Sequence, residues 1–170
     1  MLSLKQGLSL SAKKALGGWT PTDESSLEAW YQNAVGITLN GSDAQTWADS
    51  STNSYDMIQD TATEQPAYSG GILTFVSADK NSLQLAGQIS LTGDFTLGFR
   101  INTSTTNGSF IGDNTDADEY FKYAGASRVS FKIAGSSVTN LDLDSGTFGD
   151  DYLVITRASD VLTLWNNGVA

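Results

Sequence analysis

The sequence predicts an all-β fold in which short antiparallel strands form two sheets. Its longest strand-like run, 94–101, alternates strictly, so that Phe95, Leu97, Phe99 and Ile101 share one face. A period of two with one apolar face is typical of a strand that packs one side on a core. Elsewhere, short apolar runs are separated by clusters of Ser, Thr, Asn and Asp, and 17 glycines are spread along the chain. This composition favours tight turns between strands.

The composition also limits the kinds of site that the protein can hold. Its 170 residues are enough for a core, and we predict one domain over 19–170. The chain has no cysteine and no histidine. Disulfide-stapled modules, histidine-dependent triads and histidine-ligated zinc centres are therefore excluded. No apolar run approaches the roughly 20 residues of a membrane-spanning helix, and the N-terminus lacks a signal-peptide pattern, so we expect no membrane association.

Charge is distributed unevenly along the chain, whose net charge is −10. Residues 1–18 contain three lysines and no acidic residue, while the rest of the chain holds all 19 acidic residues. An acidic body disfavours nucleic acid as a partner, because phosphate contacts need clustered Lys and Arg. Leucines at even steps make 1–18 resemble an extended arm.

We predict that this N-terminal arm docks on an acidic neighbour or on a second copy of the chain, and Gly17-Gly18 would act as its joint. The alternative is a first strand followed by a loop. The expected docking residues are Leu2, Leu4, Lys5, Leu8, Leu10, Lys13, Lys14 and Trp19.

In the first half of the body we expect strands at 27–31, 71–76 and 81–85, and a short strand or a loop at 36–39. Asn40-Gly41 is a strong turn signal, and the polar cluster from Trp47 to Tyr55 predicts another turn. Before Leu27 an alternative stays open, since the Asp and Ser residues there could cap a helical turn.

The second half predicts a series of hairpins. The expected strands are 109–112, 120–123, 128–133, 138–143, 151–156 and 161–165, and an acidic loop occupies 113–119. Val129, Phe131 and Ile133 alternate with polar residues, which predicts that they face the core.

Several short motifs occur in a fixed order. They are Leu27-Glu-Ala-Trp-Tyr31, Asn40-Gly41, Trp47-Ala-Asp-Ser-Ser51 with Asn53, Gln65-Pro66, Leu73-Thr-Phe75 and Ser82-Leu-Gln-Leu85. This order resembles laminin-G-like, concanavalin A-like domains over about residues 26–168. The sequence departs from the family pattern at Ser51-Thr52, where Gly often follows Ser, and at Val76-Ser77, where Asp-Gly often stands.

The resemblance implies an antiparallel two-sheet jelly-roll sandwich. In that family further strands normally follow a hairpin like 162–169, whereas this sequence ends at Ala170. The resemblance therefore leads us to expect one of two situations: either the natural chain continues with the last strands, or the arm or a neighbouring subunit fills the missing sheet position. An unfilled edge would expose backbone pairing groups.

Catalysis is not expected from the acidic residues. Glycoside hydrolases of this fold carry carboxylates in a Glu-x-Asp-x-x-Glu spacing that flanks the sugar bond. The chain has four glutamates, Glu24, Glu28, Glu64 and Glu119, and none stands in that spacing. We therefore predict that the protein is not an enzyme.

An acidic loop is the candidate metal site. Its members Asp113, Asp116, Asp118 and Glu119 could hold calcium, because hard cations prefer several carboxylate oxygens within one flexible loop. A solvated hairpin loop is the alternative. Asp142, Asp144, Asp150 and Asp151 form a second cluster with the same two interpretations. No other cofactor is expected.

Aromatic residues are the candidate glycan site, because sugar rings stack on Trp and Tyr while polar side chains take the hydroxyls. We name Trp165, Asn166 and Tyr120 as the candidate glycan-binding residues. The alternative for each is packing within the sheets. Trp47 is expected to pack behind its own turn, as the resemblance implies.

The fold is shared by lectins, glycanases, adhesion modules and virion proteins, so the resemblance leaves the function open. With the basic arm and acidic body, it leads us to predict a virion structural or attachment protein of a tailed phage. A capsid decoration, collar or tail-fibre component is expected, with other virion proteins or itself as partner. The alternative is a calcium-assisted carbohydrate-binding or cell-surface adhesion module.

Overall fold

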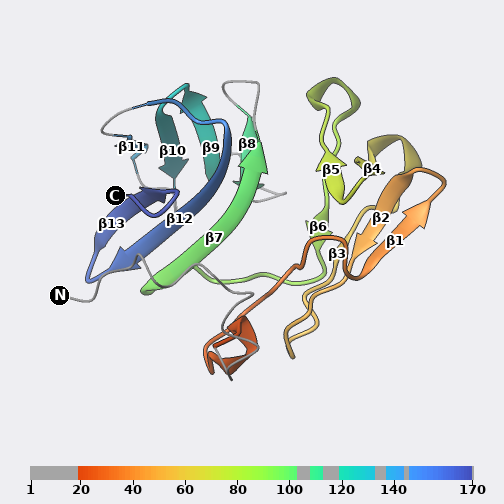
Figure 1. The fold of residues 1–170 in the computed structure, drawn as a ribbon, viewed down its shortest axis with the longest axis horizontal. Coiled ribbons are helices and arrows are strands. Elements are labelled where there is room, and N and C mark those ends of the chain that lie inside the picture. The colour runs from red at the N-terminus through yellow and green to blue at the C-terminus, as the bar shows by residue number, and fades with distance from the viewer. Residues whose placement is uncertain (1–18, 103–107, 113–118, 133–136, 144–145, 170) are drawn as a thin grey trace. The chain divides into compact units, whose positions relative to one another are not determined.

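The computed structural model describes residues 19–102, 108–112, 119–132, 137–143 and 146–169. All strand pairs in these residues are antiparallel, and the strands form three sheets (Figure 1). The all-β character is thus confirmed, while the jelly-roll topology stays a prediction. No helix within the described ranges is long and apolar enough to cross a membrane. The arm at 1–18, together with Asp113, Asp116, Asp118 and Asp144, lies outside the described residues.

Contacts within the chain divide the described residues into two units, 19–89 and 90–169. The first contains six strands in one sheet and three short 3-10 turns. The strands are β1 (Ile37–Asn40), β2 (Asp43–Trp47), β3 (Met57–Ile58), β4 (Ala67–Ser69), β5 (Ile72–Thr74) and β6 (Gln84–Leu85). The 3-10 turns are η2 (Pro21–Asp23), η3 (Ala62–Glu64) and η4 (Ser77–Asp79). The strands of this sheet follow the order β5-β4-β2-β3-β6, with β1 paired to β2.

The prediction of a strand at 27–31 is wrong, because this segment forms hydrogen bonds with a turn and not with a neighbouring strand. Trp30 N donates to Asp49 Oδ1 at 2.8 Å, and Trp30 O accepts from Ser50 N at 2.7 Å. Asn53 Nδ2 donates to the carbonyls of Leu27 and Glu28, both at 2.9 Å. The polar turn after β2 therefore takes up the backbone groups that a ladder would otherwise satisfy.

Buried amides occupy the centre of the first unit. Gln65 Nε2 donates to Gln59 O at 2.6 Å, and Gln59 Nε2 donates to Ser82 Oγ at 3.0 Å. Both glutamines are about 95 % buried, beside the buried Ala44 and Pro66. Polar groups at this depth need such partners, so the Gln-Pro motif joins the loops around the sheet.

The second unit contains two sheets. One has the order β11-β10-β9-β8 and the other β13-β12-β7. Their strands are β7 (Phe95–Asn102), β8 (Ser109–Gly112), β9 (Tyr120–Gly125), β10 (Arg128–Lys132), β11 (Thr139–Asp142), β12 (Asp150–Ala158) and β13 (Val161–Asn166). All seven agree with the predicted positions to within a few residues. Asn167 and Gly168 have φ of 51° and 83°, as a tight Asn-Gly turn requires.

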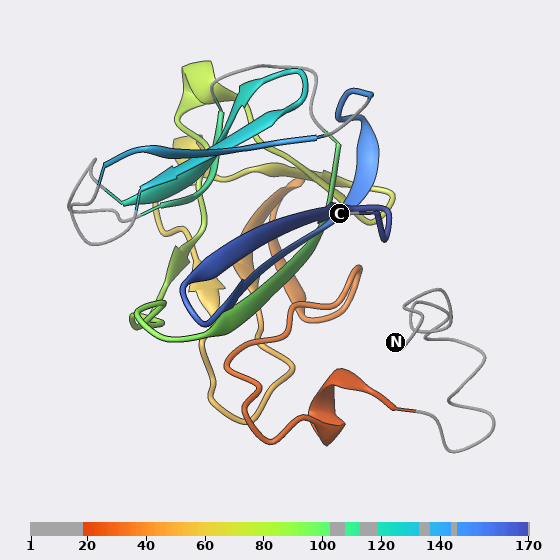
Figure 2. The same ribbon diagram turned by 90° about the vertical axis from the view of Figure 1, so that its left-hand side faces the viewer.

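One apolar cluster joins these two sheets, which lie as two layers in Figure 2. Its buried members are Phe121, Tyr123, Val129, Phe131, Phe148, Leu153, Ile155 and Leu164. The inward face of β7 packs against them, as its alternation predicts. Because the core lies between the layers, every second residue of β7, β12 and β13 points to the opposite side of the sheet.

Candidate functional site

The side of the β13-β12-β7 sheet that faces away from the core carries most of the chemistry that could bind a ligand. Register places Gly98, Val154 and Trp165 in one row across the three strands. A neighbouring row pairs Arg100 with Tyr152. We call this surface the outer face; its members are Thr96, Gly98, Arg100, Asp150, Tyr152, Val154, Thr156, Thr163 and Trp165.

Two aromatic side chains stand on the outer face. Tyr152 is 53 % exposed, and the Arg100 guanidinium carbon lies 5.5 Å from the centre of its ring. Trp165 is half-buried, and its Nε1 lies 3.5 Å from Thr156 Oγ1, a long hydrogen bond. Tyr152 and Trp165 occupy diagonal positions on adjacent strands, so their rings belong to one continuous surface.

Gly98 leaves open space on the β7 side of this surface. A Cβ built on Gly98 would have Val154 Cγ2, at 3.9 Å, as its nearest neighbour, which is an ordinary contact distance. Gly98 is exposed and lies within β7, between Thr96 and Arg100 on the same face. The missing side chain therefore leaves a gap between the side chains of Thr96 and Arg100, where a flat ligand could approach the strand closely.

The charges on the outer face are paired. Arg100 donates to both carboxylate oxygens of Asp150, from Nε at 3.1 Å and from Nη2 at 2.8 Å. This bidentate contact lowers the pKa of Asp150 and raises that of Arg100. Both groups therefore stay ionised over the ordinary pH range, and together they add no net charge to the face.

The three residues predicted to bind glycan are not brought together. Trp165 lies on the outer face, whereas Asn166 is opposite Leu153 and so points toward the core. Tyr120 lies on the far side of the other sheet, since its neighbour Phe121 is buried; there Lys122 Nζ is 4.8 Å from its ring centre. Trp47 is half-buried and donates from Nε1 to Gln32 O at 3.1 Å.

Of the residues predicted to bind calcium, only Glu119 is described, and it is half-buried. In the second acidic cluster, Asp142 is held by Arg128 and Asp150 by Arg100. Asp151 is buried and accepts from Gly149 N and Asn167 Nδ2, both at 2.6 Å. These three carboxylates thus have separate partners, and no acidic cluster suited to a metal ion occurs in the described part of the chain.

Two buried polar atoms of the second unit lack a partner within the described part of the chain. The Tyr123 hydroxyl and Asn166 Oδ1 are both buried without a hydrogen-bond partner among the described residues. Burial, and to a lesser degree the negative charge of Asp151, raises the pKa of Tyr123 above its ordinary value. Two such groups in one core indicate an unrelieved desolvation cost.

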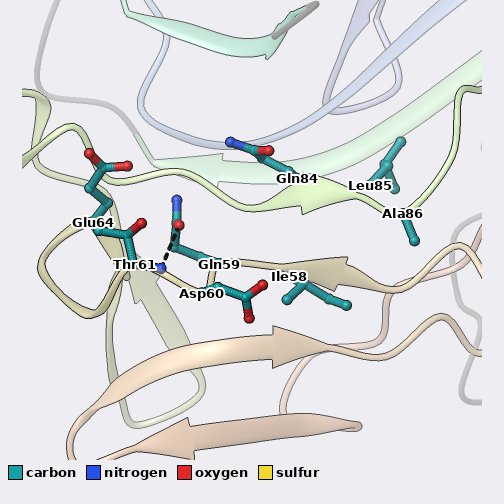
Figure 3. Close-up of a pocket in the computed structure, with 8 residues that line it drawn as sticks. All are labelled: Ile58, Gln59, Asp60, Thr61, Glu64, Gln84, Leu85 and Ala86. Carbon is teal, nitrogen blue, oxygen red and sulfur yellow. Dashed lines mark hydrogen bonds between the residues drawn. The ribbon is translucent and has the colours of Figure 1, made fainter.

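A cavity of about 380 Å³ lies in the first unit, beside β3 and β6 (Figure 3). Asp60 and Glu64 line it, and in the view of Figure 3 Gln59 lies between them. Gln59 Oε1 accepts from Thr61 N at 3.0 Å, so this amide supports the loop. A second cavity of about 310 Å³ is lined by Ser, Thr and Glu side chains next to the Asp49 turn. Neither cavity presents an aromatic side chain.

Comparison with known proteins identifies no relative: no protein-family model, no curated protein and no solved structure matches the chain. The laminin-G-like resemblance therefore stays a prediction, with which the all-β antiparallel architecture is compatible.

Proposed function

We propose that the protein is a non-catalytic attachment protein that binds carbohydrate on its outer face. The observation that carries this proposal is an aromatic pair on one face of the sheet, the exposed Tyr152 and the half-buried Trp165, together with the open space above Gly98. The two rings and this open space form a platform on which a sugar ring can stack.

The chemistry of the outer face suits a sugar in two ways. One face of a pyranose is rich in C–H groups and packs on aromatic rings, while its hydroxyls need donors and acceptors at the rim. The rim here holds the hydroxyls of Thr96, Thr156 and Thr163 as well as the charges of Arg100 and Asp150. An uncharged ligand also suits a surface whose charges are paired on a chain of net charge −10.

The proposal keeps the attachment role predicted from the sequence and combines it with the carbohydrate ligand of the alternative. A place in a tailed-phage particle, with virion proteins as partners, rests on the basic arm at 1–18 and stays a prediction. The calcium-assisted alternative differs in a testable way. No acidic cluster lies among the described residues of the outer face, so we expect binding to persist in the presence of EDTA.

The test combines a glycan array with titration calorimetry on the full chain. For Trp165→Ala and Tyr152→Ala we expect at least a tenfold loss of affinity each, because each variant removes a stacking surface. Gly98→Val should abolish binding by filling the open space above Gly98. This variant should still fold, because φ at Gly98 is not left-handed and valine favours strands.

Tyr120→Ala is the matched control, since Tyr120 also sits beside a cation but on the other sheet. It should leave the affinity unchanged. Binding that is lost in Tyr120→Ala yet retained in Gly98→Val would reject the outer face, and the absence of any bound glycan would reject the proposed function.

A further inference from the structure

On the basis of the proposed function, we infer that the Arg100–Asp150 pair makes the outer face selective for uncharged saccharides. The pair would form hydrogen bonds with two adjacent hydroxyl groups of the sugar, and it would disfavour sugars that carry a carboxylate. This names the class of ligand that the platform accepts.

The position of the pair places it at the rim of the platform. Arg100 follows Gly98 by two residues on β7, so both side-chain positions face the same way. Tyr152 is the cross-strand partner of Arg100, and Asp150 precedes it by two residues on β12. A sugar ring seated above Gly98 and beside Tyr152 would therefore bring its edge to the ion pair.

The pair retains free hydrogen-bonding capacity in the observed geometry. Arg100 has five N–H donors, of which two are used by Asp150. The carboxylate of Asp150 can accept more bonds than these two. The side chains are 57 % and 51 % exposed, so the remaining donors and lone pairs are accessible to a ligand. A hydroxyl can donate to the carboxylate while its neighbour accepts from the guanidinium.

A sugar that carries a carboxylate would bind less well at this pair. Its carboxylate would have to compete with Asp150 for the same guanidinium, because bidentate contact is the preferred geometry of that group. It would also stand close to the Asp150 charge on a chain that is already acidic. Both effects weaken binding of the charged ligand and leave a neutral one unaffected.

The experiment measures binding of matched oligosaccharide pairs to the full chain by titration calorimetry. The pairs are glucan and glucuronan, galactan and galacturonan, and mannan and mannuronan, which differ by oxidation of the C6 hydroxymethyl to a carboxylate. We expect the neutral member of the bound pair to be preferred at least tenfold. Asp150→Asn should reduce this preference to less than threefold, because the guanidinium becomes available to the ligand carboxylate.

Asp142→Asn is the control, since Asp142 forms the same bidentate contact with Arg128 on the other sheet, at 2.6 and 2.9 Å. It should leave the preference unchanged, and melting curves of both variants report on folding. Equal binding of neutral and acidic members by the unaltered chain would overturn the inference while leaving the proposed function standing. If folded Asp150→Asn keeps the full preference for the neutral oligosaccharide, the inference is likewise overturned and the proposed function still stands. Failure of every pair to bind would remove the proposed function and the inference together.

Discussion

Asp49 organises the turn that follows β2 by accepting four hydrogen bonds. The donors are the backbone N–H groups of Trp30, Ser51 and Tyr55 and the Ser51 hydroxyl, at 2.5 to 3.1 Å. Partial burial acts to raise the pKa of Asp49, but these hydrogen bonds together lower it below the ordinary value. The Trp-x-Asp-x-Ser motif thus has a physical role, since its carboxylate links the turn to segment 27–31.

Replacing this carboxylate should destabilise the first unit. We expect Asp49→Asn to lower the free energy of unfolding by about 2 kcal/mol, because an amide cannot accept all four bonds and leaves donors unpaired. Since the pKa of Asp49 is lowered on folding, its ionised form contributes stability above the unfolded pKa, and this is lost as pH falls through the folded pKa. Urea denaturation at pH 7 and below pH 4 measures both effects. Asp60→Asn, at an exposed position, is the control and should change neither.

Tyr123 presents the opposite case, a buried group without a described partner. Its side chain is 2 % exposed, and its hydroxyl has no hydrogen bond within the described residues. We expect Tyr123→Phe to raise the free energy of unfolding by about 1 kcal/mol, because the variant removes an unpaired polar group.

The same burial predicts a response to alkali. The pKa of Tyr123 is raised on folding, so its contribution is complete below the unfolded pKa near 10 and is lost as pH rises toward the folded pKa. Tyr123→Phe should therefore lose less stability than the unaltered chain between pH 9 and 11. Denaturant titrations at these pH values measure the free energy of unfolding of both chains. Tyr120→Phe, at a half-buried position, is the control. A fall in stability at pH 7 would show that the hydroxyl has a partner, for instance a buried water.

At the scale of the elements, sequence patterns were most informative where a strand has one buried face. The alternation in β7, β10 and β12 is visible in the chain because these strands cover an apolar core. β2, β3 and β4 were not predicted, since they are two to five residues long and surround buried glutamines. A period of two cannot be recognised in so few residues, and a polar interior gives no apolar signal.

The candidate site could be predicted only in part for a related reason. Trp165 was named from its residue type, but Tyr152, Gly98 and Arg100 were missed. What joins them is the cross-strand register of β7 with β12, whose partners are about 50 residues apart in sequence. Asn166 follows Trp165 directly, yet neighbouring residues of a strand face opposite sides, so one reaches the platform and the other the core.

The whole molecule combines two interiors of different kinds. In the described residues 19–89 the fully buried apolar side chains are Ala44 and Pro66, accompanied by two glutamines. In the described part of 90–169, eight buried apolar side chains form one cluster. Burial of apolar surface is the main source of folding stability, so the second unit should be the more stable.

This contrast leads to an expectation about unfolding that tests the predicted single domain at 19–170. We expect hydrogen exchange in rising urea, followed by mass spectrometry, to show 19–89 opening before 90–169, because regions with few buried apolar contacts open first. Asp49→Asn should lower the urea midpoint of the first segment alone, and Tyr123→Phe should raise that of the second alone. If each variant instead shifts the urea midpoints of both segments equally, the two segments unfold as one cooperative domain.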